Sequence, residues 1–167
     1  MQVLIIRHAI AVDHGTPPYK TDEERPLTPK GVRRMKLAAA GIARVVPSLD
    51  ALYTSPLVRA VETARLVAEA YEGSPKPEVA DVLAPGHGAA AVGRWLRSLG
   101  RDDVVGLTGH EPGCSELLSH LLVGDTSLGV EFKKGAAALV DVGWGQRGHQ
   151  AMLLWFASPA LLRATGE

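Results

Sequence analysis

Two arginines and two histidines occur at positions where they could bind an oxyanion together. They are Arg7, His8, Arg59 and His110. An arginine guanidinium presents a planar fork of N–H donors that matches phosphate oxygens, and a helix start near Arg59 would add oriented backbone amides. The chain has 18 basic and 18 acidic residues, so it has no net field to attract an anion. A local cluster of this kind would have to bind it.

The elements that must position these side chains are three short apolar segments with strand character. Val3 to Ile6 precedes the Arg7-His8 pair, Ala51 to Thr54 precedes Ser55-Pro56 and Arg59, and Val104 to Thr108 precedes Gly109-His110. The carboxyl ends of strands in an open parallel sheet meet at one edge, where such folds bind their ligands. We therefore expect the four side chains to share one crevice.

Helical patterns separate these strands, and the alternation predicts the fold class. Thr28-Pro29 and Ser55-Pro56 are typical helix starts, and a hairpin around residues 145–148 is expected near the end. We predict a three-layer α/β/α sandwich with a mostly parallel central sheet and an antiparallel edge, in a single domain spanning residues 1–167. The other expected elements are helices over 89–99, 112–123 and after Ser158-Pro159, and strands over 79–83, 136–142 and 150–156.

The segment from Ala11 to Pro26 is predicted to be a long loop with a functional role. It contains three prolines, one glycine and six charged residues without sustained periodicity. Loops of this length in compact domains are often functional. We expect substrate specificity to depend on this loop and on the flexible segment around His87.

Four segments together resemble the histidine phosphatase superfamily, also called phosphoglycerate-mutase-like. They are Arg7-His8-Ala9, LTPKG at 27–31, SPLVRAVETA at 55–64 and Gly109-His110, in the family's order and at compatible spacing. The short chain and the approach Arg25-Pro26-Leu27-Thr28 are similar to the compact phosphohistidine phosphatase branch. The resemblance implies a phosphoglycerate mutase-like fold and a metal-independent phosphatase without a cofactor.

The resemblance also implies the role of each residue. His8 would attack the phosphoryl group through one ring nitrogen, while a backbone carbonyl holds the proton on the other nitrogen. The imidazole must be neutral, and nearby cations should push its pKa below the usual value of about 6.5. Arg7, Arg59 and His110 would bind the phosphoryl oxygens, with guanidinium groups and an imidazolium supplying positive charge. Water would then hydrolyse the phosphohistidine.

One departure from the family pattern bears on the substrate. Many members that cleave phosphate esters carry a glutamate general acid after the third strand, where this chain offers only Asp81. A positioned acid is typically worth about 10²- to 10⁴-fold in rate. Phosphohistidine is more labile and depends less on such an acid, so we expect a phosphohistidine protein as substrate. The alternatives are a small-molecule phosphatase or mutase acting on sugar phosphates or phosphoglycerate, and a non-catalytic phosphate- or phosphoprotein-binding module.

Other candidate residues have simpler explanations. His87 follows the third expected strand and could border the pocket, whereas Glu111, a second weak candidate for the acid, is adjacent to His110 and could point away. Ser55 is expected to cap its helix, because no nucleophile elbow surrounds it. Cys114 is the single cysteine, so an internal disulfide and a cysteine-based metal site are excluded. The histidines also lack metal-ligand spacing.

Composition excludes several classes of partner. The balanced charge argues against binding to nucleic acid or to an anionic membrane, and no apolar run approaches the ~20 residues of a membrane-spanning helix. Met1-Gln2 leads directly into an apolar strand, without the pattern of a signal peptide. We therefore expect a soluble, cytoplasmic protein whose partner is a phosphorylated protein or a small phosphorylated metabolite.

Overall fold

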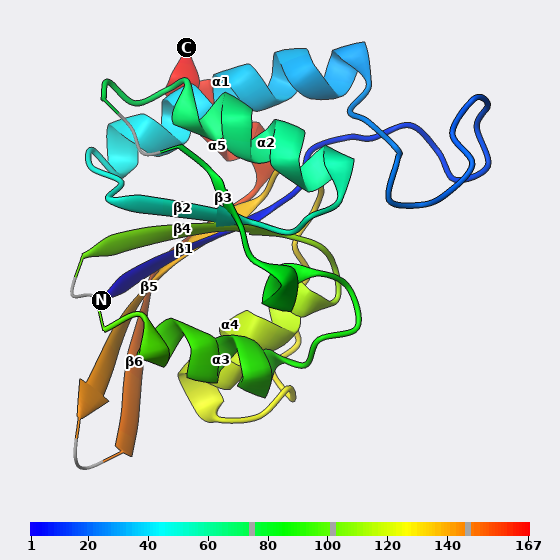
Figure 1. The fold of residues 1–167 in the computed structure, drawn as a ribbon. Helices are drawn as coiled ribbons and strands as arrows, with labels where there is room; N and C mark the ends of the chain where they lie inside the picture. Colours follow the sequence, from blue (N-terminus) through cyan, green and yellow to red (C-terminus); the bar gives the residue numbers. More distant parts are fainter. Residues whose placement is uncertain (74–75, 101–102, 146–147) are drawn as a thin grey trace.

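A six-stranded sheet in the order β3-β2-β4-β1-β5-β6 forms the centre of the structure (Figure 1). The computed structural model describes residues 1–73, 76–100, 103–145 and 148–167. The strands are β1 (Gln2–Arg7), β2 (Ala51–Thr54), β3 (Glu78–Val79), β4 (Val104–Gly109), β5 (Ala137–Gly145) and β6 (Gly148–Ala157).

The sheet is mostly parallel with an antiparallel hairpin on one side. Strand β4 pairs in parallel with β1 and β2, and β3 pairs in parallel with β2. Strand β5 runs antiparallel to β1, and β6 runs antiparallel to β5. The predicted hairpin is confirmed, although residues 146 and 147 at its tip lie outside the described residues. Because β6 is antiparallel to β5, it runs in the direction of β1 and ends at the same edge of the sheet.

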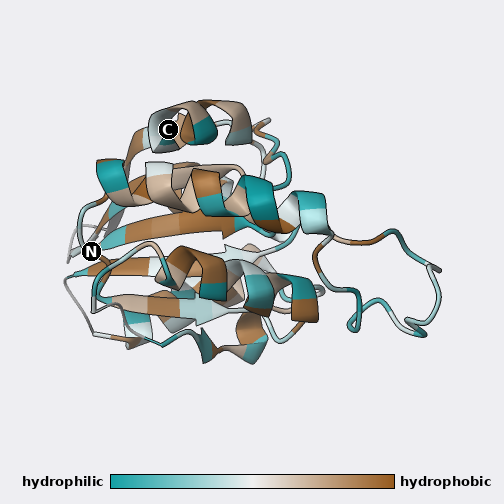
Figure 2. Cartoon of the chain, turned by 90° about the horizontal axis from the view of Figure 1, so that it is seen from above, coloured by the Kyte–Doolittle hydropathy of each residue, from teal (hydrophilic) through white to brown (hydrophobic). Residues whose placement is uncertain are grey.

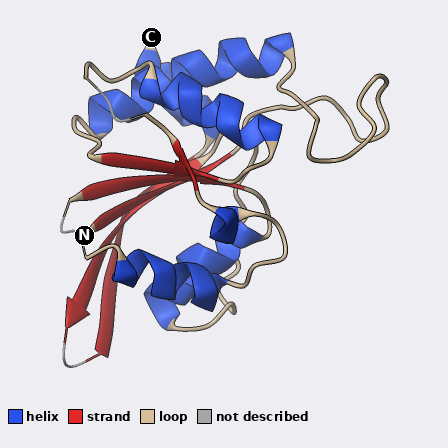
Figure 3. Cartoon of the chain, viewed as in Figure 1, coloured by secondary structure: helices blue, strands red, loops and turns tan. Residues whose placement is uncertain are grey.

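Helices cover both faces of the sheet, which confirms the predicted three-layer α/β/α sandwich (Figures 1 and 3). One layer contains α1, α2 and α5, and the opposite layer contains α3 and α4. The Thr28 and Ser158 hydroxyls cap α1 and α5 by accepting from Gly31 and Leu161, as their Thr-Pro and Ser-Pro sequences predict. The helices are α1 (Pro29–Val45), α2 (Val58–Ala68), α3 (Ala89–Ser98), α4 (Gly113–Val123) and α5 (Pro159–Gly166).

Alternate side chains of β1 build the two hydrophobic cores. Leu4 and Ile6 point to the α1–α2–α5 layer, whereas Val3 and Ile5 point to the α3–α4 layer. All four are at most 1% exposed, so the strand is apolar on both faces. Figure 2 shows largely apolar strands between helices in which apolar and polar residues alternate. Burial on both faces holds the carboxyl end of β1 in a fixed position.

Two expected elements differ in the structure. The predicted strand over 79–83 ends at Val79 and continues as a 3₁₀ helix (Asp81–Leu83), because Val82 and Leu83 turn off the sheet edge to pack against the α3–α4 core. Helix α2 begins at Val58 rather than at Ser55-Pro56. The reason is that the Ser55 N–H still bonds to the Thr108 carbonyl (3.0 Å) and so prolongs the strand pairing. Among the described helices, none is long and apolar enough to cross a membrane.

Candidate active site

The predicted residues meet at the carboxyl edge of the parallel strands. Arg7 ends β1 and His8 follows it, while His110 directly follows β4. The His8 N–H donates to the Gly109 carbonyl (2.9 Å), which locks these two strand ends together. Arg59 lies in the first turn of α2. The residues His8, Arg59 and His110 are only 6%, 4% and 6% exposed, so the cluster is largely withdrawn from water.

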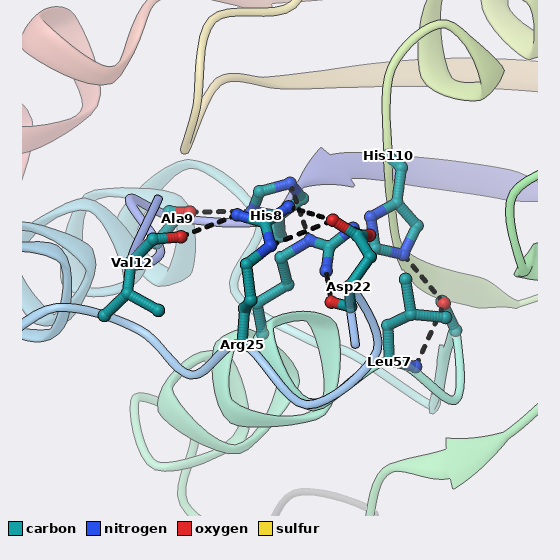
Figure 4. Close-up of polar contacts among 9 residues, drawn as sticks. His8, Ala9, Val12, Asp22, Arg25, Leu57 and His110 are labelled. Carbon is teal, nitrogen blue, oxygen red and sulfur yellow. Dashed lines mark hydrogen bonds and ion pairs between the residues drawn. The ribbon is translucent and has the colours of Figure 1, made fainter. Parts of the chain in front are cut away.

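Hydrogen bonds define the tautomer of His8. Its Nδ1 lies 2.7 Å from the Ala9 carbonyl oxygen, which can only accept, so Nδ1 carries the proton. The Arg59 Nε–H donates to His8 Nε2 over 3.3 Å, so Nε2 presents a lone pair. The ring is therefore neutral, with an unprotonated nitrogen beside a guanidinium, as the resemblance implied (Figure 4).

The Thr63 hydroxyl joins Arg59 to the strand that carries His8. This hydroxyl donates to the Arg59 carbonyl (2.7 Å), one turn earlier in α2, and accepts from the Ala9 N–H (3.0 Å). Thr63 is fully buried, so these two bonds do not compete with water. They fix the first turn of α2 against the residue that follows His8.

Arg7 is held by a segment that the sequence did not indicate. Its Nη1 donates to the Phe132 carbonyl (2.5 Å), and its Nε is buried without a partner in the described residues. The Phe132 N–H donates in turn to Glu111 Oε1 (2.6 Å). Glu111 Oε2 accepts from the Ser115 N–H and hydroxyl. The Glu111 carboxylate therefore positions Phe132, whose carbonyl binds Arg7, and both of its oxygens are engaged as acceptors.

The His110 ring lies near His8, with 5.1 Å between the ring centroids. Its Nε2 contacts the Ser55 hydroxyl at 2.8 Å, whereas its Nδ1 is buried without a partner in the described residues. The expectation that Ser55 caps α2 is wrong. Leu57 is the N-cap residue, and the Ser55 hydroxyl accepts from the Leu57 N–H (3.3 Å) while it orients His110. The unpartnered Nδ1 leaves His110 with capacity for a further hydrogen bond.

The loop over residues 11–26 contributes two charged residues that the sequence analysis missed. Asp22 accepts from Arg59 through its carboxylate (2.7 Å) and its carbonyl (2.6 Å). Its other carboxylate oxygen accepts two bonds from Arg25, which is also held by the Val12 carbonyl. The Asp22–Arg25 spacing of three residues was the available signal, but only folding brings this pair onto Arg59 (Figure 4).

Burial lowers the pKa of both site histidines. The pKa of His8 falls from 6.5 to about 3, mainly through desolvation, with His110, Arg59 and Arg7 lowering it further and the bond to Ala9 opposing them. Desolvation followed by Arg59 lowers the pKa of His110 to about 4. With this lowered pKa, the His110 ring is neutral at pH 7 in the free protein. A bound phosphoryl dianion would favour the protonated ring.

These shifts predict that acid destabilises the protein through its site histidines. Below about pH 6.5 the unfolded chain binds protons on His8 and His110, but the folded chain does not until about pH 3 to 4, so stability falls as pH falls. Between pH 7 and about pH 5, we expect the free energy of unfolding to fall by about 2 kcal/mol for each of these two histidines. Urea unfolding of the double variant His8→Asn/His110→Asn should show a smaller loss than the parent, while His14→Asn should match the parent. Equal losses in parent and double variant would contradict this origin.

A cavity of about 280 Å³ adjoins His110 on the α3–α4 side. Its walls include Val82, Leu83 and Leu107, and His87 and Glu116 also line it. His87 therefore borders this cavity. Asp81 is exposed and does not line the cavity, so it is not positioned as an acid beside His110. Nor do the described residues contain a group of three histidine, cysteine, aspartate or glutamate side chains arranged to hold a metal ion.

The fold and this cluster define an α/β/α protein with a buried histidine–arginine cluster at the carboxyl ends of parallel strands. A family model for the histidine phosphatase superfamily (branch 1) matches residues 3–83. An uncharacterised protein of Picosynechococcus sp. (strain PCC 7002) is 35% identical over 136 residues, which cover 80% of this chain and 81% of that protein. The chain belongs to the histidine phosphatase superfamily, whose members are phosphatases.

Solved structures with the same fold include phosphatases named for different substrates. The protein histidine phosphatase SixA complexed with tungstate is 26% identical, with a TM-score of 0.80 over 96% of this chain and 98% of that one. Phosphoserine phosphatase from Entamoeba histolytica is 14% identical, with a TM-score of 0.71 over 95% and 97% of the two chains. The second likeness concerns the fold alone.

Proposed function

We propose that this protein is a metal-independent phosphatase that forms a phosphohistidine on His8 and acts on phosphohistidine in proteins. The observation that carries the proposal is the state of His8. Its Nδ1 proton is fixed by the Ala9 carbonyl, and its Nε2 lone pair faces Arg59 in a buried, cationic site. A neutral ring with one oriented lone pair is the form that attacks phosphorus.

The proposed reaction has two displacements. His8 Nε2 forms a bond to phosphorus as the bond to the leaving group breaks, and the leaving group takes up a proton from solvent water. Water then attacks the phosphohistidine, the P–N bond breaks, and inorganic phosphate leaves with His8 neutral again. Arg7, Arg59 and His110 would stabilise the charge on the equatorial oxygens in both steps.

The surroundings of the site favour a substrate whose leaving group needs little help from a general acid. The Glu111 carboxylate is used by backbone donors, and Asp22 is paired with two arginines. A lowered pKa keeps Asp22 ionised, despite the opposing effect of desolvation, because Arg25 and Arg59 donate to it. Glu111 lines the cavity beside His110, but both of its carboxylate oxygens already accept hydrogen bonds, and Asp22 is held ionised. The imidazole of phosphohistidine depends less on such an acid, and the largely apolar cavity beside His110 offers space for a planar ring.

A substrate panel tests this assignment. The same enzyme preparation would be offered a phosphohistidine protein, a phosphoserine peptide, sugar phosphates and phosphoglycerate, with vanadate as an inhibitor control and with chelator present. We expect the highest kcat/KM for the phosphohistidine protein and no effect of chelator. A clear preference for the esters would instead support a small-molecule phosphatase, whose substrate would occupy the cavity beside His110.

Asp22 accepts the Arg59 hydrogen bonds that a phosphoryl group would need. Its carboxylate accepts a hydrogen bond from Arg59 Nη2, and its carbonyl accepts one from Nη1. The neighbouring Glu23 carbonyl accepts from the Val58 N–H at the start of α2 (3.0 Å). An incoming dianion must therefore replace the Asp22 carboxylate or share Arg59 with it. In this proposal the loop acts as a competitor for the anion site.

The variant Asp22→Asn should consequently bind inorganic phosphate more tightly, by several-fold to about tenfold, because the competing negative charge is removed. The inhibition constant of phosphate against aryl phosphate hydrolysis would measure the change. Asp13→Asn, an exposed substitution in the same loop, serves as the matched control. Weaker phosphate binding by Asp22→Asn would show that Asp22 organises Arg59 for the anion and does not compete with it.

A further inference from the structure

A second groove, of about 190 Å³, lies at the same edge of the sheet as His8 and is lined by four basic residues. Ala9, whose carbonyl holds His8 Nδ1, forms part of its wall. Among the residues that the structure describes, no aspartate or glutamate lines it. Its basic residues, here called the basic groove cluster, are Arg34, Lys133, Lys134 and Arg163.

The fold gathers this cluster from three distant segments. Arg34 belongs to α1, which follows the loop over residues 11–26. Lys133 and Lys134 directly follow Phe132, whose carbonyl binds Arg7. Arg163 lies in α5, which begins where β6 ends at the edge shared with β1 (Figure 1). The Gly135 N–H, next along the chain, donates to the carbonyls of Arg7 and His8. The groove and the phosphoryl site therefore share one backbone framework.

The charges of the cluster are not neutralised within the described residues. None of the four side chains forms an ion pair with a carboxylate there, although Asp22 and Glu69 do pair with other cations. Lys133, Lys134 and Arg34 are exposed and Arg163 is half-buried. In a chain with 18 basic and 18 acidic residues, four unpaired cations around one groove form a local positive field. The partial positive charge at the start of α5 has the same sign.

We propose that the basic groove cluster docks acidic side chains on the surface of a phosphorylated protein whose phosphoryl group enters the site at His8. This inference rests on the proposed function and names the surface that its protein substrate must carry. The cations are spread over three segments beside the phosphoryl site, so they suit several carboxylates of one protein surface better than one small anion. Charge complementarity of this kind steers association and selects partners.

The test compares the wild type with Lys133→Gln/Lys134→Gln. Arg94→Gln/Arg97→Gln is the matched control, because it removes two exposed charges from α3 on the opposite face of the sheet. A fluorescein-labelled decaglutamate peptide, measured by fluorescence anisotropy, reports docking without any turnover. We expect the Lys133/Lys134 variant to bind the peptide about tenfold more weakly than the wild type and the control, and salt to weaken wild-type binding.

Kinetics provide the second readout. KM for an acidic phosphohistidine protein should rise about tenfold in the Lys133/Lys134 variant with kcat retained, while kcat/KM for an aryl phosphate stays at the wild-type value. Docking is refuted if the wild type does not bind the peptide, if both double variants bind it equally, or if aryl phosphate hydrolysis falls in parallel. If the peptide distinguishes the variants but no phosphohistidine protein is hydrolysed, the docking surface stands and the proposed substrate is wrong.

Discussion

Replacing His8 with alanine should abolish hydrolysis of an aryl phosphate, lowering kcat by roughly 10⁴- to 10⁶-fold. The reason is that the variant has no lone pair at the position of Nε2, next to the Arg59 guanidinium, and no other nucleophile is placed there among the described residues. An aryl leaving group needs little protonation, so the assay reports nucleophilic attack and not the missing general acid. His14→Ala is the matched control, since His14 is exposed in the loop.

Two further observations distinguish covalent catalysis from a merely supporting role of His8. Rapid quenching of the wild type during turnover, followed by digestion under alkaline conditions and mass spectrometry, should find the peptide containing His8 phosphorylated. The His8→Ala protein should still bind inorganic phosphate through Arg7, Arg59 and His110. Equal rates in the wild type and His8→Ala would refute the mechanism, and binding without turnover in the wild type would support a non-catalytic phosphate-binding module.

Replacing Arg59 with alanine is expected to have the second-largest effect, a loss of about 10³-fold in kcat/KM for the aryl phosphate. Its guanidinium contacts His8 through Nε and presents its Nη atoms to the place where Asp22 now lies. Arg59→Lys should recover little of the loss, because an ammonium group lacks the planar fork that spans the nucleophile and the phosphoryl oxygens. Steady-state kinetics of both variants would measure these losses.

Arg65→Ala provides the control for the Arg59 variants, because Arg65 is an exposed arginine of the same helix. It should retain wild-type kinetics and so exclude a general effect of removing charge from α2. Burial of an arginine cluster also makes folding a concern, so urea unfolding of each variant should accompany the kinetics. If folded Arg59→Ala retained wild-type kcat/KM, the assignment of the phosphoryl site to this cluster would be wrong.

The fold class and the four residues of the central cluster could be predicted from the amino-acid sequence alone. Apolar runs such as Val3 to Ile6 require burial on both faces, and helix starts such as Thr28-Pro29 specify local backbone geometry. These properties depend on residues close together in the chain, so they can be predicted from the sequence. Once the strands are parallel, their carboxyl ends must meet, so the sequence pattern alone predicts Arg7, His8 and His110 at one edge.

The partners that bind these four residues could not be predicted from the sequence, because they depend on tertiary contacts. Asp22 reaches Arg59 across 37 positions of the chain, and the Phe132 carbonyl reaches Arg7 across 125. The desolvation that lowers the pKa of His110 and the role of Ser55 as its partner also depend on packing between separate elements. Contacts between residues so far apart in the chain depend on how the loops pack against the folded core. No local pattern of residue types encodes that packing.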